Sequence, residues 1–141
     1  MFAGDESAAP AISAGLKRLP DGATATAYIE IEAEDRTFEL PTRDGVEITW
    51  VVRNGATHGT ELSRVVRAAG IPQEKKTGWF IHGVAEMIKE LRRFLFVESG
   101  IPKEDVSISG YWRIGMTEDQ WQSSKRNFNA EIEAEDERAK A

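Results

Sequence analysis

The alternation of short apolar runs with amphipathic helical patterns is the feature that most constrains the fold of this chain. Runs rich in β-branched and aromatic residues predict five strands, and apolar residues at helical spacing recur between them. Strands that alternate with helices form parallel βαβ units. We therefore predict an α/β fold, a three-layer, doubly wound and mainly parallel five-stranded sheet. The strands are expected at residues 1–4, 24–31, 46–52, 78–82 and 106–109, with a short extra strand at 36–40.

Helix-capping signals divide the rest of the chain. Ser7 is expected to cap a helix that runs to about Arg18, because its hydroxyl can accept from a first-turn amide. Thr117 and Gln120 have capping-box spacing, so the last helix should begin there. Beyond it the chain is so polar that we expect it to fray, which predicts a domain over residues 1–128 and an acidic, frayed tail over 129–141. The remaining helices are expected at residues 60–69 and 84–98.

Composition excludes several classes of protein. Eighteen basic residues against 24 acidic ones give a net charge of −6, which disfavours a nucleic-acid binder. No apolar run approaches the roughly 20 residues that span a bilayer, and the first residues do not form a signal peptide. The chain has no cysteine and two histidines without ligand spacing, so no metal site is expected. These features predict a cytoplasmic protein without a nucleic-acid or membrane partner.

The loop after the first strand is the first candidate ligand site, because α/β sheets bind ligands beyond the carboxyl ends of their strands. Gly4 to Ala8 open a helix there, and small residues allow the backbone to approach a pyrophosphate. Asp5 and Glu6 would repel phosphates unless they turn away. From the residues alone, a capped helix start is favoured over a phosphate site.

Two other strand ends carry residues suited to a nucleotide or a flavin. Glu30 and Glu32 end the second strand, where a carboxylate can accept from an adenosine ribose, although a solvated row of glutamates is the favoured interpretation. Tyr111 and Trp112 follow the fifth strand and can stack on a flat ring, while Arg113 can attract an anion. The alternative is that the two aromatic residues fill the sheet edge and Arg113 is solvated.

Three blocks of sequence together resemble one known family. They are Ala-Gly-Asp-Glu-Ser-Ala-Ala-Pro-Ala-Ile at 3–12, Trp-Phe-Ile-His-Gly-Val-Ala-Glu-Met at 79–87 and Ser-Ile-Ser-Gly-Tyr-Trp-Arg-Ile-Gly at 107–115. In this order they resemble the C-terminal half of the siderophore-interacting proteins, flavin-dependent ferric-siderophore reductases of the ferredoxin-reductase superfamily. The resemblance covers residues 2–121 and implies the NAD(P)-binding-domain strand order 3-2-1-4-5.

The resemblance implies the nicotinamide-nucleotide-binding half of an iron-transport oxidoreductase. In that family NADPH or NADH reduces FAD, which then reduces siderophore-bound Fe(III). A preceding β-barrel holds the FAD, and the sequence does not contain one. We therefore expect this chain to be inactive alone and to meet a separate FAD-binding barrel or self-associate. The resemblance assigns cofactor binding to Gly4, Asp5, Glu6, Ser7, Ala8, Gly83, Val84, Ala85, Tyr111 and Trp112, and contact with the ferric siderophore to Arg113.

One departure from the family pattern supports an alternative. The family usually carries a glutamate where this chain has Val84. The family glutamate is therefore replaced here, unless Glu86 serves in its place. This change favours a non-catalytic, stand-alone binding or interaction module that kept the fold and lost the redox chemistry. His82, beside this turn, is expected to be a hydrogen-bonded structural residue and not a proton relay.

Overall fold

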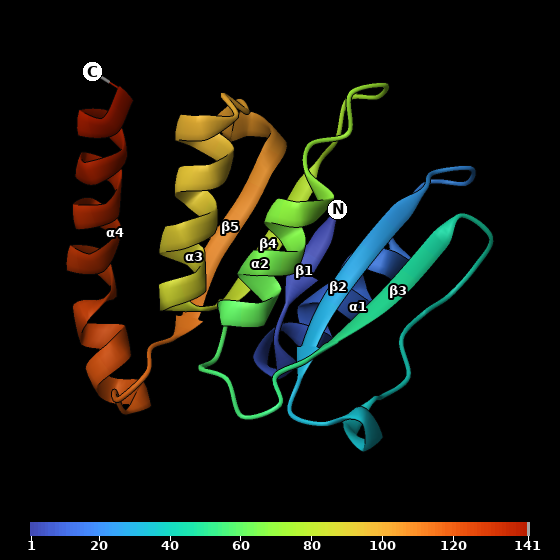
Figure 1. Ribbon diagram of the computed structural model, residues 1–141, viewed down its shortest axis with the longest axis horizontal. Coiled ribbons are helices and arrows are strands. Elements are labelled where there is room, and N and C mark those ends of the chain that lie inside the picture. Colours follow the sequence, from blue (N-terminus) through green and yellow to red (C-terminus); the bar gives the residue numbers. More distant parts are fainter. Residues whose placement is uncertain (141) are drawn as a thin grey trace.

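All five strands run parallel, in the order β3-β2-β1-β4-β5, in the computed structural model, which describes residues 1–140 (Figure 1). The predicted fold class and strand order are confirmed. The strands are β1 (Phe2–Gly4), β2 (Ala25–Ile31), β3 (Val46–Val52), β4 (Trp79–Val84) and β5 (Val106–Trp112). The helices are α1 (Ala9–Lys17), α2 (Thr60–Ala69), α3 (Ala85–Arg92) and α4 (Glu118–Lys140), with 3-10 turns at Glu6–Ala8, Glu34–Arg36 and Lys103–Asp105 and a π-helical end to α3 at Arg93–Glu98.

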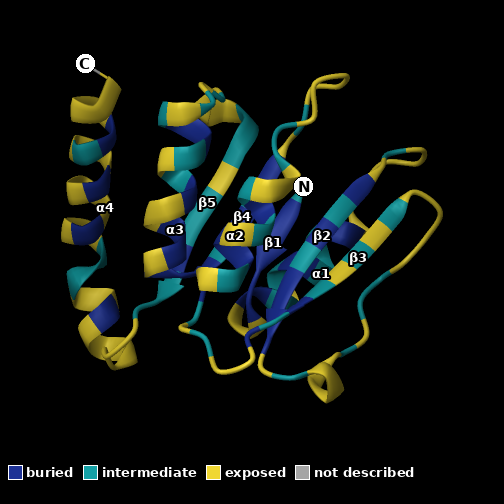
Figure 2. Cartoon of the chain, in the orientation of Figure 1, coloured by how far each residue is buried: buried dark blue, intermediate teal, exposed yellow. Residues whose placement is uncertain are grey.

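The helices cover the two faces of the sheet unequally. Helices α2 and α3 lie on one face and α1 lies on the other (Figure 1). The α2–α3 side packs on Ile81 and Leu91, which are both fully buried, and the α1 side packs on Ile12 and Ile29. Figure 2 shows the buried stripes of the helices facing the sheet. Each apolar stripe follows the helical spacing seen in the sequence.

Local structure differs from prediction at two places near the amino end. The residue that caps the first helical turn is Asp5, whose carboxylate accepts from the Ser7 amide at 2.9 Å, and not Ser7 itself. Residues 36–40 form no strand, because the chain leaves the sheet after β2 through the 3-10 turn and returns only at Val46. The capping box is confirmed, since the Thr117 amide donates to Gln120 Oε1 and the Gln120 amide donates to Thr117 Oγ1.

Helix α4 continues to Lys140 instead of fraying after residue 128. It lies beside α3 (Figure 1), with Ile132 buried in the contact. Asp136 is also buried, and it accepts from Arg92 Nε of α3 at 3.2 Å. An ion pair from Lys89 to Glu135 adds to the same seam. The polar composition hid a narrow apolar and ionic stripe that needs α3 as its partner. Residue 141 lies outside the described residues, and the domain division at residue 128 stays a prediction.

Candidate functional site

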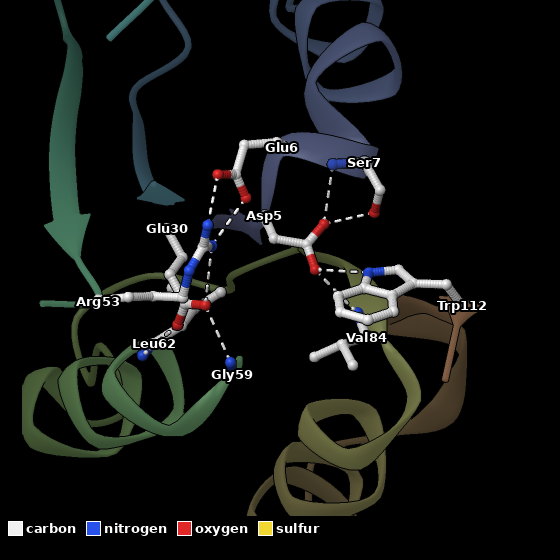
Figure 3. A network of polar contacts seen from close by, with 9 residues as sticks. All are labelled: Asp5, Glu6, Ser7, Glu30, Arg53, Gly59, Leu62, Val84 and Trp112. Atoms are coloured by element: carbon white, nitrogen blue, oxygen red, sulfur yellow. Dashed lines mark hydrogen bonds and ion pairs between the residues drawn. The ribbon is translucent and has the colours of Figure 1, made fainter. Parts of the chain in front are cut away.

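Asp5 ties together the ends of three strands at the carboxyl edge of the sheet (Figure 3). Its side chain is buried, with Oδ1 accepting from the backbone amide and the hydroxyl of Ser7. Oδ2 accepts from the Val84 amide at 3.1 Å and from Trp112 Nε1 at 3.1 Å. A buried carboxylate is stable only when donors compensate its lost hydration, and four donors do so here. The ends of β1, β4 and β5 therefore converge on one carboxylate.

Asp5 also shapes the carboxyl end of β4, where Gly83 and Val84 are the last two residues of the strand and not a turn beyond it. Gly83 has φ +152°, and a Cβ there would lie 2.9 Å from Asp5 Oδ2, so glycine is required. Val84 presents its amide to Asp5, whereas its side chain is fully buried in the core. Ala85 is also fully buried, against Trp121 and Phe128 of α4. Of this predicted trio, only backbone atoms of Gly83 and Val84 reach the edge.

A second network crosses the ends of β1, β2 and β3 (Figure 3). Arg53, directly after β3, donates from both terminal nitrogens to Glu6, at 2.8 and 2.6 Å. It also donates to Glu30 Oε1 at 3.3 Å. Burial is the largest single influence on Glu6 and opposes its ionisation, but the hydrogen bonds and charge of Arg53, together with backbone hydrogen bonds, outweigh it and lower the pKa of Glu6. Arg53 thereby offsets the charge of Glu6 from within the chain.

Glu30 is not part of a solvated row of glutamates. It is fully buried, and its carboxylate accepts from the Gly59 amide at 2.9 Å and the Leu62 amide at 3.1 Å. These amides lie at the start of α2, so the side chain of Glu30, in β2, caps that helix. Glu32 is exposed, as expected. Strand alternation fails as a guide at Glu30 because helix α2 covers the face toward which this side chain points.

The two aromatic residues of β5 point away from each other. Trp112 packs with the α2–α3 side of the sheet, and its ring meets the edge of His58 at 4.9 Å between centroids. Tyr111 packs on the α1 side, where it meets His82 at 5.1 Å. Both lie within β5 instead of beyond it. Trp112 therefore joins the Asp5 site, whereas Tyr111 does not.

Arg113 is the first residue past β5, and it is only partly free. Its guanidinium stacks over Phe128 at 5.2 Å and lies 4.0 Å from Glu86 Oε2, with 38% of the side chain exposed. Glu86 also accepts from the Ile114 amide at 3.0 Å. Helix α4 thus shields this surface in part, and Glu86 fixes the loop that follows β5.

His82 has the contacts of a structural residue. Its ring stacks on Phe80 at 3.9 Å, and Nε2 lies 2.9 Å from Ser107 Oγ. Burial lowers the pKa of His82 to about 4, and the positive charge of Lys125 adds to the shift. The imidazole is therefore neutral at physiological pH. Its side chain lies on the α1 side, away from Asp5 and Trp112.

A large, open cavity lies at the opposite edge of the sheet. It has a volume of about 1220 Å³ and opens between Phe2, Leu19 and Gly78, near the amino ends of the strands. Ligands of α/β sheets bind beyond the carboxyl ends, where helix amides and the reversal of strand order create a crevice. The order found here reverses between β1 and β4, where Asp5 lies. We therefore place the candidate site at the Asp5 edge.

The structure brings together most of the predicted residues, and it adds two. Gly4 is required there because a Cβ would lie 2.8 Å from the Ala8 Cβ and from the His82 carbonyl oxygen. Arg53 and His58 were not identified from the sequence. An arginine directly after an apolar strand was the available signal for Arg53, while His58 lies in a loop without a pattern. Among residues 1–140, no group of three metal-ligating side chains comes together, and no helix is long and apolar enough to cross a membrane.

Comparison with known proteins places these features in one family. The family model described as siderophore-interacting protein matches residues 1–115. An uncharacterized protein of Mycobacterium tuberculosis is 38% identical over 146 residues, covering 95% of this chain and 50% of the relative. Ferric vibriobactin reductase ViuB of Vibrio cholerae is 25% identical, covering 89% and 46%. The crystal structure of a siderophore utilization protein from T. fusca matches with a TM-score of 0.70 at 33% identity, covering 83% and 45%.

The chain spans about half the length of the curated relatives that it matches. The family model covers most of the chain, from β1 to the loop after β5, and therefore includes every loop of the Asp5 site. Relatives of this kind include ferric-siderophore reductases. This chain belongs to the siderophore-interacting protein family.

Proposed function

We propose that this chain is the nicotinamide-nucleotide-binding half of a ferric-siderophore reductase. The observation that carries the proposal is the convergence of three strand ends on Asp5, at the point where the strand order reverses. The point of reversal is the usual ligand site of an open parallel sheet. The reductase activity itself is known for relatives such as ferric vibriobactin reductase.

The groups at this edge suit the ring and ribose ends of a nicotinamide nucleotide. Trp112 offers a flat ring whose orientation is fixed by its bond to Asp5, and Glu32 offers an exposed carboxylate for a ribose hydroxyl. The pyrophosphate has less support, because the Ser7 and Val84 amides already donate to Asp5. When bound, the nucleotide would supply a hydride. We expect weak binding, with a dissociation constant on the order of 1 mM.

FAD is assigned to a separate domain, because the family that this chain resembles holds FAD in a preceding β-barrel. When held there, FAD would carry electrons from the nicotinamide to siderophore-bound Fe(III). We propose that Arg113 contacts such a domain and an acidic ferric siderophore, although its guanidinium already lies 4.0 Å from Glu86 and over the ring of Phe128. The purified chain should be colourless, and a flavin absorbance band that persists through gel filtration would contradict this assignment. A cytoplasmic location fits the chemistry proposed.

Amide chemical shifts provide the test. NADH and NADPH are titrated to about 5 mM into the isotopically labelled chain, well above the expected dissociation constant. The largest shifts should occur at residues 4–8, 83–85 and 111–113. Amides at the amino-end cavity, such as Gly78, provide the internal control and should stay in place. Shifts confined to that cavity would contradict the proposed site.

A second function is favoured by one observation, the prior use of the Ser7 and Val84 amides by Asp5. A chain whose phosphate donors are filled by its own carboxylate can serve as a non-catalytic binding or interaction module. The titration decides between the two functions. If neither nucleotide moves any amide of the three loops, the interaction module is the better account.

A further inference from the structure

We infer that the Glu6–Arg53 pair makes the chain selective for NADH over NADPH, an inference that rests on the proposed function. The two nucleotides differ by a phosphate on the adenosine ribose, which is recognised near the carboxyl end of the second strand of such sheets. A neighbouring arginine accommodates this phosphate, whereas a carboxylate accepts from the hydroxyl that replaces it. Selectivity therefore depends on which arginine is free at this end of the sheet.

Arg53 directly follows β3, whose last residue pairs with the last residue of β2. Its donors already form hydrogen bonds to carboxylates of this chain. The residue is 7% exposed, and its two terminal nitrogens contact Glu6 and Glu30 at 2.6 to 3.3 Å. Two carboxylates against one guanidinium leave this cluster with one net negative charge. An incoming phosphate dianion would meet that charge instead of a free cation. The hydroxyl of NADH carries no such penalty.

Glu6 is the member of the cluster that controls access to Arg53. Glu30 is fully buried and accepts from two backbone amides as well as from Arg53. Moving its side chain away would leave the first amides of α2 without an acceptor. The Glu6 side chain is 42% exposed, and the Glu32 backbone also helps to lower its pKa. Glu6 thus spans the ends of β1, β2 and β3 and covers the outer side of the guanidinium (Figure 3).

The other arginine on this side is poorly placed to compensate. Arg36 ends the exposed 3-10 turn after β2 and directly follows Glu34 and Asp35. Its positive charge is therefore offset by two adjacent acids. Both arginines near the expected ribose position are accompanied by carboxylates, which explains how the acidic edge would favour the nucleotide of lower charge.

The experiment measures dissociation constants of NADH and NADPH for the wild-type chain, for Glu6→Gln and for Glu34→Gln, by amide-shift titration. The wild-type chain should bind NADH about tenfold more tightly, the effect of one or two nearby unit charges in a solvated site. Glu6→Gln should tighten NADPH about tenfold relative to NADH, because Arg53 is then released. Glu34→Gln removes the same charge from this edge without releasing Arg53, so it should change NADPH by less than about twofold.

Other outcomes separate the selectivity from the proposed function. If wild-type chain binds NADPH as tightly as NADH, or if both variants tighten NADPH equally, the role of the Glu6–Arg53 pair is overturned while nucleotide binding stands. If neither nucleotide binds, both proposals fail together. Circular dichroism of Glu6→Gln checks that the variant is folded, and a misfolded variant leaves the wild-type preference to decide the question.

Discussion

Replacing Asp5 with asparagine tests whether this carboxylate organises the candidate site. Asparagine keeps the shape and one acceptor oxygen, but its amide nitrogen must face one pair of donors. If the oxygen stays on the Val84 amide and Trp112 Nε1, the Ser7 amide loses its acceptor, whereas the Ser7 hydroxyl can turn to accept. Losing one hydrogen bond to a charged group costs about 1.5–3 kcal/mol, and the other bonds weaken with the charge.

We therefore expect Asp5→Asn to lower the free energy of unfolding by about 2–4 kcal/mol, and Asp5→Ala to cost more because it also leaves the Val84 and Trp112 donors unpaired. Urea unfolding followed by far-ultraviolet circular dichroism gives these values. Hydrogen exchange of the Trp112 indole gives a local readout, and it should accelerate at least about tenfold in Asp5→Ala. Asp35→Asn, at an exposed acid, is the control and should change stability by less than about 0.5 kcal/mol.

The reasoning would be refuted by an Asp5→Asn chain that unfolds like the wild type and protects the Trp112 indole equally well. In that case the four short contacts would not hold the three loops together. The loops would then owe their positions to the sheet alone.

Three further predictions follow from contacts described above. Gly83→Ala should cost about 2–4 kcal/mol in urea unfolding, because its Cβ would press on Asp5 at a φ of +152°; a loss below about 0.5 kcal/mol would contradict this. Because the pKa of His82 is lowered to about 4 in the folded chain, its contribution to stability is present above about pH 6.5 and is lost as the pH falls towards 4, by about 1–2 kcal/mol after solvent screening. His82→Gln should remove that pH dependence, and a His82 pKa near 6.5 by NMR titration would exclude it. Trp121→Ala should cost about 3–5 kcal/mol and speed amide exchange in α4, since this side chain is fully buried; unchanged exchange would show that α4 docks by other contacts.

The sequence determined the order of the elements because local signals mark their ends. Alternating apolar runs set the strands, Gly70 follows α2, and the capping box at Thr117 and Gln120 marks the start of α4. What could not be predicted are contacts between distant elements. The burial of Glu30 depends on amides of α2, and the ordered end of α4 depends on Arg92 of α3.

The candidate site shows the same division. The loops were located from the rule that ligands bind beyond the carboxyl ends of strands, yet the direction of each side chain within the loops was not predictable. Asp5 was expected to face a ligand or turn away, and the structure shows it turned inward to four donors. The sequence suggests one aromatic pair at Tyr111 and Trp112, but the pleat of β5 sends the two side chains to opposite sides of the sheet. Their part in binding stays a prediction.

The central position of β1 has a consequence for how the molecule assembles. This three-residue strand joins the β2–β3 pair to the β4–β5 pair, and it precedes both pairs along the sequence. One side of it can pair early with β2, but the other must wait for β4, as the bond from the Met1 amino group to the Gly78 carbonyl, 77 positions away, illustrates. Long-range closure of this kind slows folding. Strand β1 therefore connects the two halves of the sheet. Proteolytic cleavage or mispairing of β1 would leave two separate strand pairs, each with a newly unpaired edge open to aggregation.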